Sequence, residues 1–327
     1  MKNIIPFFAV GLSVLLSGCA NDASQAPTPG AGSGSAAEVA IPIEVVCTTN
    51  IIKDLVQQIG GDRVTVTAIM DGPGVDPHSY TPSPKDTNAL AAADLVVYSG
   101  LHLEGRLHDA LHSLEHRGVP VICVTDGIRK EEDSRLIQTE EGVADPHVWF
   151  DPDLWSSCGQ WLAAELSKFD AAGKDEYEAA AEAFAKSMAD TKEKGVAIIA
   201  PIPRERRVLV TAHDAFAYFA RAFDFDVQAV QGISTESEPG VRRVNELVEI
   251  LVSQKISAVF TEQSVSEKNI QALVAGCKAS GHDLVIGAKL FSDTAGANGT
   301  EEETLSGALL YNIQQIADAL TVEGASE

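Results

Sequence analysis

Short runs of β-branched and other apolar residues alternate with longer stretches of helical spacing in the first half of the chain, from Ile41 onward. The strand-like runs are IPIEVVCTTN at 41–50, RVTVTAIM at 63–70, ADLVVYSG at 93–100 and VPVICVTD at 119–126. Between the first two runs, residues 51–60 place their apolar side chains on one helical face before Gly60 and Gly61 end the pattern. This alternation predicts parallel strands covered by helices, in one α/β unit that ends near residue 170.

A long segment rich in Ala, Glu and Lys follows, from about Lys174 to Ala200, and it contains no proline before Pro201. The segment predicts a single helix of many turns. The strand pattern then restarts, with apolar runs at 207–213, 226–233, 257–263 and 284–293. Helical spacing separates these runs and returns in a last helix, which is predicted around Glu301 to Leu320.

We therefore predict an α/β fold of two lobes, each with a mainly parallel sheet flanked by helices, joined by one long rigid helix. The N-terminal lobe is predicted at 41–172, the connecting helix at 173–201 and the C-terminal lobe at 202–327. In folds of this kind, ligands bind beyond the carboxyl ends of the parallel strands. A binding site is therefore expected between the two lobes.

The start of the chain has the pattern of an exported lipoprotein. Residues 1–18 are predicted to be a signal peptide, because Lys2 precedes an apolar run that is too short to span a membrane comfortably. The sequence Leu-Ser-Gly-Cys that follows resembles the bacterial lipobox and makes Cys19 the predicted lipidation site; a plain signal peptide with an incidental cysteine is the alternative. Residues 19–40, rich in Ala, Gly, Ser and Pro, predict a flexible tether. The protein is thus expected on the outer face of the cytoplasmic membrane or in the periplasm.

Charge and cysteine content indicate which partners and which kinds of metal ligand this chain can have. The 47 acidic against 24 basic residues give a net charge of −23, which repels nucleic acid and attracts cations. The chain contains no CxxC pair, and its other four cysteines stand alone in strand-like or helical segments, where a small buried residue is typical: Cys47, Cys123, Cys158 and Cys277. A disulfide between two of them stays open. Any metal chemistry is therefore expected to use histidines and carboxylates.

Four residues stand out as candidate metal ligands. His78 and His147 each end an Asp-Pro-His tripeptide, whose proline stiffens the loop that presents the imidazole. The preceding aspartate either orients the ring or caps the next turn. His213 follows the strand-like RVLVTA and Asp293 follows LFS, so all four are expected at the ends of strands, two from each lobe. Three imidazoles and one carboxylate suit a borderline divalent ion such as zinc or manganese.

Other polar residues have more ordinary interpretations. Glu262 also ends a strand and is an alternative acidic ligand, although a role in holding loops together is favoured. Glu236 and Glu238, in STESEPG, have the pattern of turn and cap residues. A row of histidines with helical spacing follows an apolar face, and it is either a solvated stripe or a weak auxiliary metal site: His108, His112 and His116. His102 and His282 are expected to have no metal role.

Five motifs, in order, resemble one known family: VDPHSYTPSPKD, ADLVVYSGLHLE, DPHVWFDP, VTAHDAFAYFARAF and LFSDTAG. The chain is similar over nearly all of residues 41–320 to the cluster A-I solute-binding lipoproteins of zinc and manganese ABC importers. The resemblance implies two α/β lobes, a rigid linking helix and one transition-metal ion between the lobes. Its ligands are implied at the same four positions: His78, His147, His213 and Asp293.

The resemblance also implies a role and its partners. The protein is expected to capture a divalent ion, zinc or manganese with iron(II) as a further option, and to deliver it as a monomer to a membrane permease driven by a separate ATPase. The segment at 126–146 is acidic instead of histidine-rich, which leaves both zinc and manganese open. The alternatives are a surface adhesin of the same fold and a zinc hydrolase. Hydrolysis is disfavoured because catalytic zinc keeps a position open to water, whereas a fourth protein ligand is predicted here and HExxH is absent.

Overall fold

A parallel sheet of four strands, in the order β2-β1-β3-β4, forms the centre of the first half of the chain. The strands are β1 (Ile43–Thr49), β2 (Val64–Met70), β3 (Leu95–Tyr98) and β4 (Val121–Cys123). The computed structural model describes residues 41–130, 133–139, 142–236 and 238–321, which lie in one compact unit. The predicted signal peptide, Cys19 and the tether lie outside these residues. The strand β1 is buried along nearly all of its length, as a central strand between helices must be.

The helices of the first half are α1 (Asn50–Gly60), α2 (Pro84–Ala92), α3 (His108–His116), α4 (Asp126–Lys130) and α5 (Pro152–Phe169). The helix α1 begins where the Thr49 hydroxyl accepts a hydrogen bond from the N–H of Ile52, and it ends before Gly61, whose φ is 54°. The helix α5 was not predicted, although its start is typical. Asp151 caps it by accepting from the N–H groups of Asp153 and Leu154, and a proline fills its first position.

Two parallel strand pairs, β5–β6 and β7–β8, lie in the second half. The strands are β5 (Val208–Thr211), β6 (Asp226–Ala229), β7 (Ala258–Glu262) and β8 (Val285–Leu290). The strands β5 and β7 lie next to each other. The helices are α7 (Ala217–Phe223), α8 (Val241–Ser253), α9 (Lys268–Ala279) and α10 (Leu305–Thr321). The last helix begins later than predicted, because a separate 3₁₀ turn occupies residues 301–303.

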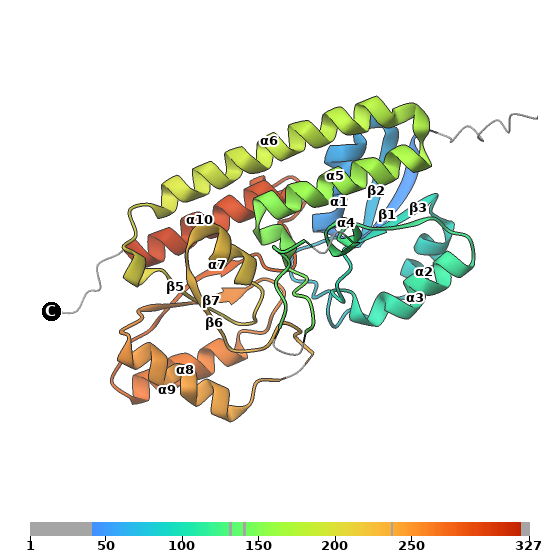
Figure 1. Cartoon of the computed structure of the whole chain (residues 1–327). Helices are drawn as coiled ribbons and strands as arrows, with labels where there is room; N and C mark the ends of the chain where they lie inside the picture. The colour runs from blue at the N-terminus through green and yellow to red at the C-terminus, as the bar shows by residue number, and fades with distance from the viewer. Residues whose placement is uncertain (1–40, 131–132, 140–141, 237, 322–327) are drawn as a thin grey trace, which may run out of the picture. The chain divides into compact units, whose positions relative to one another are not determined.

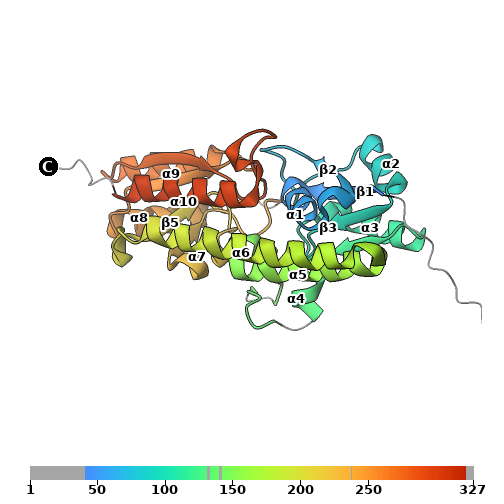
Figure 2. The ribbon, with the colours of Figure 1, turned by 90° about the horizontal axis from the view of Figure 1, so that it is seen from above.

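The helix α6 (Lys174–Ile199) confirms the predicted long helix and contacts α1, α5 and α10. Figures 1 and 2 show it lying beside α5, from the first half, and α10, from the second. A Cβ atom added at Gly195 would lie 2.6 Å from Cδ1 of Ile313 in α10, so only glycine allows this close approach. The helix α6 therefore packs against helices of both halves along its length. No helix within the described ranges is long and apolar enough to cross a membrane.

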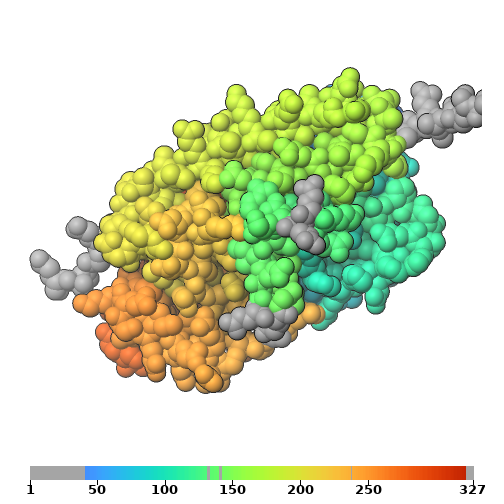
Figure 3. Space-filling view, viewed as in Figure 1, coloured from blue at the N-terminus to red at the C-terminus, as the bar shows by residue number. Residues whose placement is uncertain are grey.

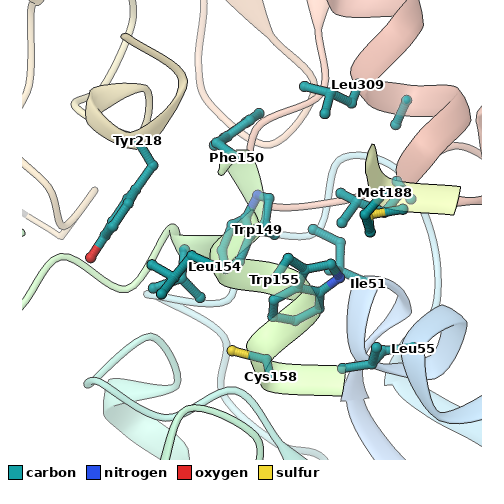
Figure 4. Packing of buried hydrophobic residues seen from close by; sticks show 14 of the residues in the cluster. Ile51, Leu55, Trp149, Phe150, Leu154, Trp155, Cys158, Met188, Tyr218 and Leu309 are labelled. Carbon is teal, nitrogen blue, oxygen red and sulfur yellow. The ribbon is translucent and has the colours of Figure 1, made fainter. Parts of the chain in front are cut away.

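The largest of three hydrophobic clusters in the described residues extends through both halves (Figure 4). Trp149 and Trp155, both at most 1 % exposed, pack in one cluster with Leu55 from α1, Met188 from α6 and Leu309 from α10. Because the same core holds helices from both halves, their relative movement would require core side chains to repack. The fold class is confirmed, while the boundaries predicted for the two lobes stay a prediction.

Candidate metal centre

His78 is presented by the loop that follows β2. Asp76 in this loop accepts hydrogen bonds from the backbone N–H of His78 (2.9 Å) and from the hydroxyl of Ser79 (2.7 Å). The same carboxylate accepts a hydrogen bond from Thr235 Oγ1 in the second half of the chain (2.6 Å). Asp76 therefore caps the turn that carries His78 and connects this turn to the second half.

The aspartate of the second Asp-Pro-His motif contacts the imidazole ring itself. Asp145 Oδ1 accepts from the backbone N–H of His147 at 2.9 Å and lies 2.7 Å from its Nδ1. If Nδ1 donates its proton to this carboxylate, Nε2 is the nitrogen that offers a lone pair. The predicted place at a strand end is wrong for His147: β4 ends at Cys123, and His147 directly precedes the turn 148–150 that leads into α5. Two buried aromatic residues in that turn anchor the segment in the core.

His213 and Asp293 follow β5 and β8, as predicted, and Glu262 ends β7 beside them. Glu262 accepts from the backbone N–H of His213 (2.9 Å), and its other oxygen lies 2.5 Å from Nδ1 of that ring. Asp293 accepts the Ser264 hydroxyl at Oδ2 (2.8 Å), and its Oδ1 has no hydrogen-bond partner. Glu262 therefore orients His213, and Ser264 orients Asp293.

Three imidazole Nε2 atoms and one carboxylate oxygen meet where these segments converge. Asp293 Oδ1 lies 3.3 Å from Nε2 of His147, 3.3 Å from Nε2 of His213 and 3.9 Å from Nε2 of His78. All four atoms lie within 4.8 Å of one another, and none has a hydrogen-bond partner. Ligands about 2.1 Å from a tetrahedral zinc ion are about 3.4 Å apart, so these separations fit one metal ion.

Burial and charge act in opposite directions on these groups. Burial and the two neighbouring imidazoles lower the pKa of His78 to about 4, although Asp293 opposes them. Burial also disfavours the charged form of His147, but Asp145 and Asp293 outweigh it and raise its pKa to about 9. The pKa of His213 is likewise raised, against burial, by Asp293 and Glu262. The histidines in turn hold the pKa of the buried Asp293 well below its usual range. Without an ion, the carboxylate is therefore stabilised by protonated imidazoles.

The least buried of the four side chains, His78 at 3 % exposure, lines a cavity of about 390 Å³. His102, Pro146 and Ile233 also line this cavity, so residues from both halves enclose it. In the space-filling view, the green segment before α5 lies between the teal and the orange parts of the chain (Figure 3). The cavity therefore borders the centre at the His78 side chain, although Nε2 of His78 is itself enclosed.

The other candidates lie away from this point. The polar residues predicted as surface or turn residues are exposed: His108, His112, His116, Glu236 and Glu238. Nε2 of His282 lies 2.6 Å from the carbonyl oxygen of Ile256, which gives this ring a structural contact. The four cysteines in the described part of the chain are free thiols.

The model of the family described as "Zinc-uptake complex component A periplasmic" matches residues 45–319. The chain belongs to this family. The manganese-binding lipoprotein MntA of Bacillus subtilis is 43 % identical over 89 % of this chain and 94 % of its own length. The zinc-binding protein TroA of Treponema pallidum is 40 % identical over 88 % of this chain and 92 % of its own length.

A solved structure of a similar protein gives the same result. The structure described as the periplasmic zinc-binding protein TroA from Treponema pallidum superposes with a TM-score of 0.81 at 38 % identity, covering 85 % of this chain and 99 % of that one. A further similar protein, from Streptococcus cristatus, is named as a metal ABC transporter substrate-binding lipoprotein; it is 28 % identical over 85 % of this chain and 89 % of its own length. The resemblance drawn from the five motifs is thereby confirmed.

Two contacts, one at the centre and one on the exposed surface beside α3, were not predicted. Ser264 lies in no pattern that marks it as a partner of Asp293, since the two residues are distant in sequence and meet only through the β7–β8 pairing. The ring of His102 lies 6.2 Å from that of His108, although the helical spacing of the histidine row does not include it. In the sequence, the position of His102 just before the predicted helix was the feature that could have indicated this contact.

Proposed function

We propose that this chain is the extracytoplasmic solute-binding component of an ABC importer, which captures zinc or manganese and delivers it to a membrane permease. The observation that carries the proposal is the meeting of four buried donor atoms that have no other partner. Leaving such atoms unpaired is unfavourable, and a cation satisfies all four together. Family membership supports the same role, since its relatives are named as zinc- or manganese-binding proteins.

In this proposal His78, His147, His213 and Asp293 are the ligands of the transported ion. His78 and His147 come from the first half, and His213 and Asp293 come from the second. Asp145 and Glu262 hold the Nδ1 side of two rings, so that Nε2 points at the ion. The ion replaces the protons that these imidazoles hold in the ion-free protein, and it takes over their role of balancing the Asp293 charge.

The donor set favours a borderline transition metal. Imidazole and carboxylate ligands suit zinc, manganese and iron(II), whereas calcium and magnesium prefer oxygen ligands throughout. By the Irving–Williams order the isolated site binds zinc more tightly than manganese. The ion that is transported in the cell is therefore set by metal availability as well as by affinity.

Capture fits the burial of the centre better than catalysis does. A catalytic zinc site keeps one coordination position open for water and substrate. Here the four donor atoms are enclosed, and each is a protein atom already facing the centre. The protein is therefore proposed not to be an enzyme, and the ion is its cargo.

The proposal includes an anchor and two partners. Lipidation at Cys19 would hold the protein at the outer face of the cytoplasmic membrane, with residues 19–40 as the tether. A permease would receive the ion, and a separate ATPase would supply the energy. The chain itself is proposed to act as a monomer.

Titration of the protein with zinc and with manganese, in competition with a chelator, tests this function. One tightly bound ion per chain is expected, and His147→Ala should abolish this tight step. The control variant His116→Ala replaces an exposed histidine and should keep the tight binding step. If the wild-type protein showed no tight binding step, the result would contradict metal capture and favour the alternative role as a surface adhesin.

A further inference from the structure

A row of exposed histidine side chains runs along α3 and its preceding loop. His108, His112 and His116 lie on the face of α3 opposite the buried Leu111 and Leu114. The fold adds His102, which is also exposed and whose φ of 66° turns the chain just before the helix. Four imidazoles are thus neighbours on one surface.

Neighbouring rings in this row have nearly the spacing of the buried centre. Ring centroids at the buried centre are 5.3 to 5.8 Å apart. In the row, the centroid separations are 6.2 Å for His102–His108, 6.5 Å for His108–His112 and 4.5 Å for His112–His116. Exposed side chains can rotate to remove such differences, and histidines four residues apart on a helix can bind one metal ion together.

The row ends at the cavity that borders the buried centre. His102 and His108 both line a cavity of about 590 Å³. His102 also lines the cavity of about 390 Å³ that contains His78. The exposed imidazoles therefore extend from the surface of α3 to the cavity that borders the centre at His78.

The exposed charges beside this row have both signs, Arg106 and Arg117 as well as Asp109 and Glu115, while the molecule as a whole is acidic. Nδ1 of His108 lies 3.6 Å from Oδ1 of the exposed Asp109, and Glu115 is exposed on the same helix. The net charge of −23 raises the local concentration of cations around the whole molecule. Imidazole nitrogens are suitable ligands for divalent transition-metal ions.

We propose that His102, His108, His112 and His116 form a second, weaker site at which adjacent histidine pairs bind a divalent transition-metal ion. The pair His112–His116 is its main chelate. The site collects ions beside the cavity that His78 lines, and this collecting role rests on the function proposed above. Two ligands hold an ion less tightly than four, so ions exchange quickly from the row.

Calorimetric titration of the full chain with zinc chloride tests the second site. The wild-type protein is expected to bind a second ion at least about tenfold more weakly than the first, which corresponds to about 1.4 kcal/mol. The double variant His112→Gln/His116→Gln should lose this second step and keep the first. The control variant Ser113→Ala, also at an exposed position of α3, should keep both.

The variant His147→Ala separates the two proposals. It should lose the tight step and keep the weak one, because His147 lies at the buried centre and not in the row. A wild-type protein without the weak step, or a weak step that survives in the double variant, would overturn the second site. A wild-type protein that shows the weak step but no tight step would instead overturn the function proposed above.

The collecting role is tested by the rate at which the buried centre fills. Trp149 lies 5.3 Å from the ring of His147, so its fluorescence offers a stopped-flow signal for loading. At zinc concentrations below that of the protein, the double variant should fill the centre more slowly by about twofold or more. Equal rates in the double variant and the wild type would exclude this role.

Discussion

Carboxylates contact Nδ1 of two histidines at the centre. These contacts orient the rings so that Nε2 faces the ion. Asp145 contacts Nδ1 of His147, and Glu262 contacts Nδ1 of His213. Such contacts fix the ring and raise the basicity of Nε2, which strengthens a bond to a metal. At the scale of single residues, the affinity of the site therefore depends on side chains that do not touch the ion.

Replacement of Glu262 by Gln should weaken zinc binding by about 10- to 100-fold, because the amide keeps the shape but removes the negative charge beside Nδ1 of His213. Chelator competition measures the affinity. The control is Glu236→Gln, whose carboxylate is exposed and paired with Arg106 at the surface. Unchanged affinity in Glu262→Gln would show that this contact only holds the loop.

Binding should also release protons and strengthen as the pH rises. In the ion-free protein the pKa of His147 is about 9 and that of His213 is raised, so both rings are protonated at pH 7. A metal ion needs them neutral, so binding displaces about two protons near pH 7 and tightens toward pH 9. Calorimetry in buffers of different ionisation enthalpy measures the number. A binding enthalpy independent of the buffer would contradict the expectation.

At the scale of elements, α6 determines how the helices of the two halves pack together. It contacts α5 from the first half and α10 from the second, and two glycines permit close approaches in this region. A Cβ at Gly159 of α5 would lie 2.8 Å from Cδ1 of Phe184 in α6, and a Cβ at Gly195 would meet Phe223 and Ile313. The packing, and not only the helical propensity of α6, therefore sets its position.

The variant Gly195→Val should lower the free energy of unfolding by about 1 to 3 kcal/mol, since the added side chain overlaps Ile313 Cδ1 and Phe223 Cε1. Urea unfolding measures the change. The matched variant Ala197→Val adds bulk at an exposed position of the same helix and should change stability by less than about 1 kcal/mol. Equal stability of the two variants would mean that the α6–α10 contact adjusts freely.

At the scale of the whole described unit, the two halves are held together near the centre by hydrogen bonds between side chains and backbone groups as well as by the core. Asn50, at the start of α1, pairs with both the N–H and the carbonyl of Ala295 (3.1 and 3.0 Å). Asp54 accepts from the N–H of Leu305 at the start of α10 (2.9 Å). These bonds join the first half to the segment that carries Asp293, so a wide hinge motion would break buried hydrogen bonds.

Ion binding should therefore change the molecule only locally. The radius of gyration of the ion-free and the zinc-loaded protein, measured by small-angle X-ray scattering, should differ by less than about 1 Å. Hydrogen exchange should slow in the loops around His78 and His147 and stay unchanged in α6. A decrease of several ångströms on loading would indicate hinge closure instead.

Local sequence patterns predict most of the helices and strands of this protein and its candidate metal ligands. The Ala-, Glu- and Lys-rich composition and the lack of proline predict α6, and the β-branched runs predict the parallel strands. The Asp-Pro-His repeats and the polar residues after strands point to His78, His147, His213 and Asp293 without reference to contacts. The helix α5 escaped prediction although its cap, Asp151 followed by Pro152, lies in the sequence.

Only the tertiary structure decided how these residues meet. Whether an aspartate caps a turn, as Asp76 does, or orients a ring, as Asp145 does, depends on where the neighbouring chain passes. The contact between Ser264 and Asp293 and the place of His102 beside His108 likewise arise from segments that fold together. Local patterns determine helices and strands because those depend on near neighbours along the chain. Hydrogen-bond partners and ligand separations depend on packing between distant segments, which no local pattern specifies.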